Sequence, residues 1–113
     1  MEPKMYYLDT DYTRQAQGPF KTLKKAREIA RYLVTSPRRD IRITATGGKR
    51  GSGSGSEGYV GMTKDYEFYF ENTSHDNAQL KYGARYVLKK DGSLGAEIPR
   101  YKGDTVKGSQ KWL

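Results

Sequence analysis

The chain of 113 residues contains no cysteine and only one histidine, His75. Without cysteine, a disulfide framework, a thiolate nucleophile and a cysteine-ligated zinc site are all excluded. A single histidine excludes a histidine pair on a metal and leaves little for a Ser-His-Asp arrangement. Because the absence of cysteine suits a reducing compartment, we expect a cytoplasmic protein.

Long apolar runs are missing as well. No stretch approaches the roughly 18 apolar residues of a membrane span, and the N-terminal residues lack the hydrophobic segment of a signal peptide. Hydrophobic residues make up 35% of the chain, but ten Tyr, three Phe and one Trp still supply enough ring surface for a core. We therefore expect a single domain over residues 1–98, followed by a polar C-terminal tail at 99–113.

Closely spaced carboxylates are also scarce. Glu67 and Glu71 are four residues apart on a predicted strand, about 13 Å along it, which is too far for the close carboxylate pair of a retaining glycosidase. Metal-dependent nuclease chemistry needs several acidic residues at one point. Only tertiary folding could bring together Asp65, Glu67, Asp76 and Glu97. The sequence therefore predicts no enzyme, no metal site and no cofactor.

The segment 47–58 is rich in glycine. Six glycines in twelve residues predict a flexible loop without regular structure. Its part 51–56 is a perfect Gly-Ser repeat, which natural loops and engineered linkers share, and both origins stay open. Gly53, Gly55 and Gly58 match G-x-G-x-x-G, but a dinucleotide site needs a helix directly afterwards, and a strand-like segment follows here. No nucleotide site is predicted.

One helix is predicted, at 22–35. Thr22 is a suitable N-cap, and Pro37 stops the pattern. At about 100° per residue the apolar side chains fall in one arc, and a second set of mostly basic residues falls opposite them: Lys21, Lys24, Lys25, Glu28, Arg31 and Tyr32. The inward side chains are Leu23, Ala26, Ile29, Ala30, Leu33 and Val34.

Six segments have the composition of strands: 4–9, 40–46, 59–62, 65–72, 84–90 and 94–98. In 40–46, Ile41, Ile43 and Ala45 alternate with polar residues, which predicts a half-buried strand. The strand-helix-strand order at the N-terminus favours a right-handed crossover between parallel strands, and Asp91-Gly92 favours a type I′ hairpin turn. We predict an α+β fold, order β-α-β-β-β-β-β, with the amphipathic helix on a mostly antiparallel sheet of about five to six strands.

Positive charge is concentrated between residues 21 and 50. This segment has ten Lys and Arg against Glu28 and Asp40, so it carries +8, which equals the net charge of the chain. A localised field of this size selects anionic partners, and Arg suits bidentate contact with phosphate. We predict a small, non-catalytic nucleic acid binding domain, with its centre at Arg38-Arg39. The predicted contact residues are Lys21, Lys24, Lys25, Arg31, Arg38, Arg39, Arg42, Lys49 and Arg50.

Other partners stay open beside DNA or RNA. The same basic surface would fit an acidic protein surface, as in the accessory or inhibitor modules of phages and mobile elements that block host defence enzymes. Exposed tyrosines would suit such a protein-protein interaction. Tyr69, which lies beside Glu67 and Glu71 on the polar side of its strand, is expected to be an exposed ring. A charged helix face can also be a solvated surface without a partner. A purely structural component of a larger assembly is a further alternative, and it would have an unpaired sheet edge.

Overall fold

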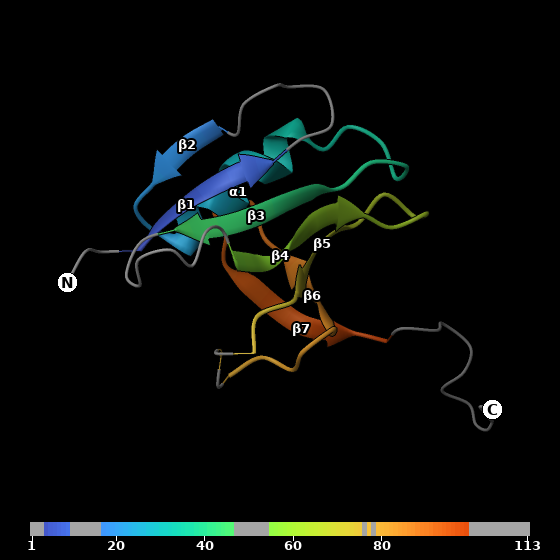
Figure 1. Ribbon diagram of the computed structural model, residues 1–113. Coiled ribbons are helices and arrows are strands. Elements are labelled where there is room, and N and C mark those ends of the chain that lie inside the picture. Colours follow the sequence, from blue (N-terminus) through green and yellow to red (C-terminus); the bar gives the residue numbers. More distant parts are fainter. Residues whose placement is uncertain (1–3, 10–16, 47–54, 76, 78, 100–113) are drawn as a thin grey trace.

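The computed structural model describes residues 4–9, 17–46, 55–75, 77 and 79–99. Within these residues it has one helix and one sheet of seven antiparallel strands, ordered β2-β1-β3-β4-β5-β6-β7 (Figure 1). The predicted α+β class, with one helix on a mostly antiparallel sheet, is confirmed, although the strands number seven rather than five to six. The elements are β1 (Met5–Asp9), β2 (Gln17–Phe20), α1 (Leu23–Leu33), β3 (Ile41–Thr46), β4 (Gly55–Met62), β5 (Phe68–Asn72), β6 (Arg85–Leu88) and β7 (Leu94–Ile98).

Strand β2 is the element that the sequence pattern missed. Its Gly18-Pro19 pair has the composition of a turn, yet β2 pairs antiparallel with β1, with Phe20 opposite Tyr6. Proline is tolerated because β2 forms the edge of the sheet, where a missing N–H breaks no second ladder. Since β2 reverses the chain before α1, strands β1 and β3 run antiparallel, and the predicted parallel crossover is wrong.

Helix α1 begins where the sequence predicts. The hydroxyl of Thr22 accepts a hydrogen bond from the Lys25 N–H at 3.0 Å, which satisfies one of the free donors of the first turn. The helix ends at Leu33, because Val34 already has an extended backbone. Ala26 and Ala30 are completely buried, and their small side chains let the helix approach the sheet closely.

The hydrophobic core lies between α1 and the face of the sheet that α1 covers. Figure 1 shows α1 behind β1 and β3, so the viewer looks at the uncovered face. The helix contacts mainly β1 to β4, and the sheet continues past it through β5, β6 and β7. The predicted inward alternation of β3 is confirmed. The buried core residues are Leu8, Ala26, Ala30, Val34, Ile41, Ile43, Val60, Phe70 and Leu88.

The glycine-rich segment is only partly a loop. Strand β4 starts at Gly55, so the prediction of irregular structure is wrong for 55–58, while 47–54 lie outside the described residues. Pairing with β3 outweighs the weak strand propensity of glycine: Ser56 lies opposite Thr44, and Gly58 lies opposite Ile43. A Cβ on Gly58 would overlap the Phe70 ring, so glycine is required there by close packing.

The β6–β7 turn differs from the predicted type. A type I′ turn needs positive φ at both central residues, but of Asp91 and Gly92 only Gly92 has it, at 91°. The Gly92 N–H donates to the Lys89 carbonyl at 3.0 Å, and the Lys89 N–H donates to the Ser93 carbonyl at 2.9 Å. These bonds describe a type I turn followed by a left-handed glycine, another common hairpin loop.

Candidate anion-binding surface

The predicted contact residues of the helix and of the loop after it lie at opposite ends of α1. Lys21, Lys24 and Lys25 are exposed at the N-terminal end. Arg38 and Arg39 are exposed in the loop that follows the C-terminal end. The helix has 11 residues, so about 16 Å of helix axis separates the two groups. They cannot be adjacent contacts on one phosphate.

Arg42 lies on the other side of the sheet. Because the apolar residues of β3 face the helix, alternation places Arg42 on the uncovered face, where its guanidinium pairs with Asp9 at 3.0 Å. Lys49 and Arg50 lie outside the described residues. The predicted surface is therefore divided between two faces of the molecule.

The predicted centre, Arg38-Arg39, is balanced by neighbouring acids. The loop after α1 runs beside the β4–β5 turn, because Ile41 pairs with Val60, and both segments project at the right of Figure 1. Three basic and three acidic exposed side chains share this corner, so it has no formal surplus of positive charge. They are Arg38, Arg39, Lys64, Asp40, Asp65 and Glu67.

The positive surplus of the described residues lies instead on α1 and the β6–β7 turn, which together we call the helix–hairpin surface. It contains seven basic and two acidic residues, a formal charge of +5. All other described charged residues comprise seven basic and seven acidic ones and cancel. The members of the helix–hairpin surface are Lys21, Lys24, Lys25, Arg27, Arg31, Lys89 and Lys90, with Glu28 and Asp91.

Two contacts join the β6–β7 turn to α1. The backbone of Gly92 lies so close to the Lys24 carbonyl that a Cβ would overlap it. The Lys24 ammonium also pairs with the Asp91 carboxylate at 3.6 Å. Tertiary packing therefore brings Lys89 and Lys90 beside the first turn of a helix that lies more than sixty residues earlier in the chain.

Arg27 lines the seam between α1 and the neighbouring β5 and β6–β7 turn, beside the strands that the helix mainly contacts. Its Nε donates to the Gly92 carbonyl at 2.8 Å, and its guanidinium lies 5.1 Å from the centre of the Phe70 ring. Burial lowers the pKa of Arg27, and the field of Tyr6 opposes this shift. A guanidinium stays charged in proteins, so the seam holds a half-buried positive charge.

Arg31 occupies the next position along the same seam. Its Nε donates to the Leu88 carbonyl at 3.3 Å, and its guanidinium stacks 4.1 Å from the centre of the Phe68 ring. The prediction that Arg31 stands on the outer face of the helix is therefore wrong in part: the residue is half-buried, because a strand carbonyl and a ring attract its head. Within the described part of the chain, no carboxylate pairs with Arg27 or Arg31.

The lysines of this surface are weakly held. Lys24 and Lys25 pair with Asp91 and Glu28, but more than half of each lysine side chain is exposed, at 57% and 54%. Exposed pairs of this kind contribute only about 0–1 kcal/mol, so a phosphate can replace the carboxylate. Lys21, Lys89 and Lys90 are exposed and form no ion pair with another described residue.

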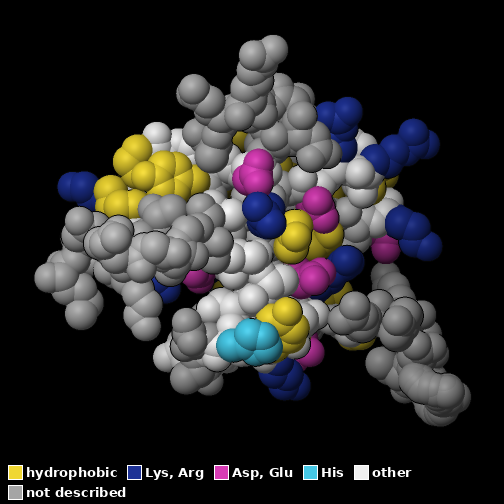
Figure 2. Space-filling view, viewed as in Figure 1, with side chains coloured by type: hydrophobic (Ala, Val, Ile, Leu, Met, Phe, Trp, Pro, Cys, Tyr) yellow, Lys and Arg dark blue, Asp and Glu magenta, His cyan; other side chains and the backbone are white. Residues whose placement is uncertain are grey.

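The uncovered face of the sheet has the opposite character. Strand register places Asp9, Arg42, Tyr59, Glu71 and Arg85 in one row across five strands. The acids and bases pair at short distances, 3.0 Å for Arg42–Asp9 and 3.1 Å for Arg85–Glu71. Figure 2 views this face, and acidic and basic side chains alternate over its middle. The charges of the row are neutralised within the sheet.

Tyr69 belongs to the uncovered face but is not exposed. Only 6% of Tyr69 is accessible, because the ring lies on the bare backbone of Gly61 and the Arg85 guanidinium stacks above it at 4.3 Å. Burial raises the pKa of Tyr69. The expectation of an exposed ring at Tyr69 is wrong, because glycine on the neighbouring strand left room for the ring to lie flat.

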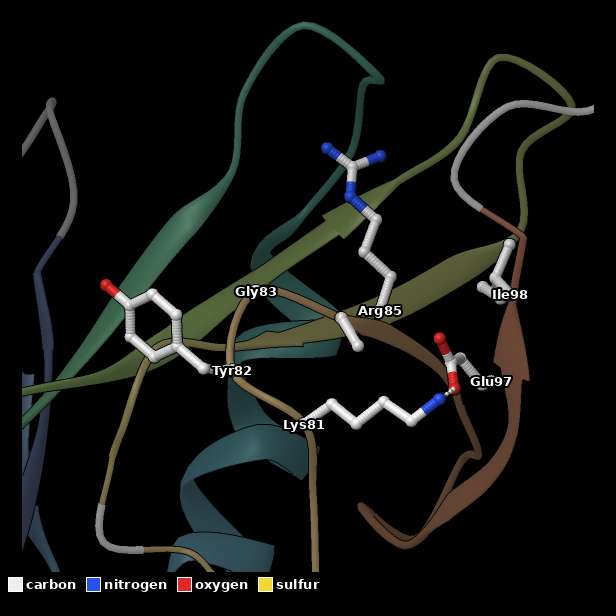
Figure 3. Close-up of a pocket in the computed structure, with 7 residues that line it drawn as sticks. Lys81, Tyr82, Gly83, Arg85, Glu97 and Ile98 are labelled. Atoms are coloured by element: carbon white, nitrogen blue, oxygen red, sulfur yellow. Dashed lines mark ion pairs between the residues drawn. The ribbon is translucent and has the colours of Figure 1, made fainter. Parts of the chain in front are cut away.

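A shallow cavity of about 210 Å³ opens beside β7 (Figure 3). The Lys81–Glu97 ion pair, at 3.2 Å, crosses its lining, and Tyr82 on its rim stacks on His75 with the ring centres 4.0 Å apart. Arg85, also in the lining, is paired with Glu71. The charges around this cavity are matched, so it offers an anion less than the helix–hairpin surface does. Over the described ranges, no three His, Asp or Glu side chains gather where they could hold a metal ion.

Sequence reasoning missed Arg27, Lys89 and Lys90 as members of the basic surface. The helical pattern assigned Arg27 to neither the apolar nor the basic face. Lys89 and Lys90 are separated from α1 by four strands in the chain. The turn signal at Asp91-Gly92 could have located a hairpin. Nothing in the sequence indicates that this hairpin docks on the helix.

No protein-family model matches this chain, no curated protein matches it in sequence, and no solved structure matches it in fold. Among the elements described, the only helix is α1, which is too short and too polar to cross a membrane. The helix–hairpin surface therefore has to be interpreted from its own geometry and charge.

Proposed function

We propose that this protein is a non-catalytic domain that binds the phosphate backbone of a nucleic acid through the helix–hairpin surface. One observation carries the proposal: the described residues have a surplus of +5 on this surface, and their charges cancel elsewhere. A one-sided surplus orients the molecule toward a polyanion and releases counterions when phosphates are neutralised. Binding to the backbone alone is independent of base sequence.

The held arginines support a phosphate contact. Arg27 and Arg31 each use Nε for a backbone carbonyl, which fixes the position of the guanidinium. A guanidinium has five N–H donors, and the other four are on its terminal nitrogens. A fixed guanidinium loses little side-chain freedom when it binds phosphate. The exposed lysine side chains around it add contacts that adapt to the position of the ligand.

The test neutralises lysines on the helix–hairpin surface while keeping its fixed arginines. The triple variant Lys21→Gln, Lys25→Gln and Lys90→Gln removes three positive charges there. We expect the slope of log K against log salt to decrease in magnitude by about 2–3, since each neutralised phosphate contributes about 0.7 to 0.9. Fluorescence anisotropy of labelled DNA and RNA oligonucleotides over a range of salt concentrations measures the slope.

A matched control removes the same charge elsewhere. The triple variant Lys4→Gln, Lys64→Gln and Lys81→Gln also lowers the net charge by three, but these lysines lie in regions where charges cancel. We expect its salt slope to stay close to that of the wild type. An equal loss in both triple variants would show that only net charge matters. No binding of DNA or RNA at low salt would contradict the proposal outright.

An acidic protein could use the same surface, and one measurement separates the two partners. Tagged protein is used to capture partners with and without nuclease treatment. Under the proposal, capture depends on intact nucleic acid. Recovery of one stoichiometric acidic protein after nuclease treatment would instead favour an inhibitor-type or accessory module.

A further inference from the structure

Tyr32 is an exposed ring on the outward side of α1, within reach of the helix–hairpin surface. It is 73% exposed, more than any other large hydrophobic side chain among the described residues. At 100° per residue, it lies about 20° from Lys25 around the helix axis and about 10 Å further along it. No described residue stacks on the Tyr32 ring or hydrogen-bonds to its side chain. The ring is therefore available to a ligand.

The other exposed rings have different surroundings. Tyr82 is stacked on His75, which occupies one face of its ring. Tyr66, at 70% exposure, belongs to the β4–β5 turn, where Asp65 and Glu67 would repel phosphate. Tyr32 is thus the strongly exposed aromatic residue that coincides with the positive surplus of the described chain.

An aromatic ring beside basic side chains distinguishes single strands from duplexes. In a duplex the faces of the bases are covered by their neighbours, so a surface ring gains nothing from stacking. In a single strand a base can leave the backbone and stack on a ring, while the adjacent phosphates contact Lys or Arg. On the same helix, Lys25 lies about 20° from Tyr32 on one side and Arg31 about 100° on the other. Glu28, about 40° from Tyr32, is paired with Lys25 at 3.2 Å.

We infer that the nucleic acid is single-stranded and that Tyr32 stacks on one of its unpaired bases. This inference rests on the proposed function, in which the helix–hairpin surface binds the backbone. Every base has an aromatic face, so stacking on Tyr32 does not select a sequence. The phenol hydroxyl takes no part in stacking, and the ring alone is required.

The experiment compares one oligonucleotide as a single strand and as a duplex with its complement. We expect the wild type to bind the single strand more tightly. Tyr32→Ala should weaken single-strand binding by roughly 5- to 100-fold and leave duplex binding unchanged. Tyr32→Phe should bind like the wild type, because it keeps the ring. Alanine favours helix, so circular dichroism should show that Tyr32→Ala stays folded.

Tyr66→Ala is the matched control, since it removes a similarly exposed ring that is not part of the helix–hairpin surface. Its affinity for the single strand should equal that of the wild type. Equal affinity for single strand and duplex, together with no effect of Tyr32→Ala, would overturn the inference and leave the proposed function standing. Equal weakening of single-strand and duplex binding by Tyr32→Ala would also overturn it. Absence of binding to either form at low salt would instead reject the proposed function.

Discussion

The two faces of the sheet hold arginine in different ways. On the uncovered face, Arg42 and Arg85 each meet a carboxylate on the neighbouring strand. On the side of the helix, Arg27 and Arg31 contact backbone carbonyls and phenylalanine rings. Arginine is common to both faces, but only the second arrangement leaves its charge uncompensated. Whether a face attracts anions therefore depends on the group that contacts the arginine, a carboxylate or a carbonyl and a ring, and not on the arginine itself.

The difference has a structural cause in the width of the sheet. Helix α1 covers mainly β1 to β4, and the rings of Phe68 and Phe70 on β5 lie near its edge. The guanidinium groups of Arg27 and Arg31 lie over these rings and donate to the carbonyls of Gly92 and Leu88. The two arginines therefore cover the edge of the hydrophobic core and place positive charge there.

The largest expected effect comes from separating the hairpin from the helix. Gly92→Ala would force a side chain into positive φ, at 91°, and against the Lys24 carbonyl. Left-handed strain and overpacking together predict a loss of about 2–5 kcal/mol in the free energy of unfolding. Urea denaturation measures it. Gly83→Ala is the control, because Gly83 also has positive φ but nothing lies within 4 Å of its Cβ position. Equal losses in both variants would mean that the joint between hairpin and helix contributes little.

A smaller effect separates the two kinds of arginine. Arg27→Ala removes a charged hydrogen bond and the guanidinium that lies over Phe70, which predicts a loss of about 1–3 kcal/mol in unfolding free energy. Arg42→Ala on the uncovered face removes only an exposed ion pair and should cost about 0–1 kcal/mol. Thermal or urea unfolding of both variants gives the comparison. If Arg42→Ala proved the more costly change, the assignment of a covering role to the seam arginines would be wrong.

The smallest effect is a titration within the β6–β7 turn. A hydrogen bond from the Ser93 hydroxyl, at 2.6 Å, is the main reason that the pKa of Asp91 is lowered to about 2. A lowered pKa in the folded state stabilises the fold at higher pH, and this contribution disappears as pH falls from about 4 toward 2. Nuclear magnetic resonance titration of the Asp91 carboxyl carbon should show this midpoint. Ser93→Ala should raise it, and an unchanged midpoint would exclude the hydroxyl as the cause.

Helices and strands could be predicted from the sequence where apolar residues repeat with a simple period. The apolar arc of α1 and the alternation of Ile41 and Ile43 predicted both the elements and the faces that they bury. Strand β2 was missed because Gly18-Pro19 has turn composition, and its pairing with β1 supplies the strand structure. The start of β4 at Gly55 was missed for the same reason, since its partner strand rather than its own side chains makes it a strand.

The candidate site was readable only in part. Lys21, Lys24 and Lys25 were predicted from the charge of the helix, and all three are exposed. The emphasis on Arg38 and Arg39 did not anticipate that acids of the β4–β5 turn lie beside them. Charge compensation depends on residues that are distant in the chain, so counting charges along the sequence does not reveal it.

The sequence by itself determined the net charge of +8, the absence of cysteine chemistry and an amphipathic helix on a largely antiparallel sheet. These properties follow from composition and from periods of two or 3.6 residues, which are local. Tertiary structure alone decided that Arg42 is neutralised by Asp9, that Arg31 stacks on the Phe68 ring, and that the turn containing Lys90 lies beside α1. Strand register and the close approach of Gly92 to α1 set these contacts, because they fix which distant charges become neighbours.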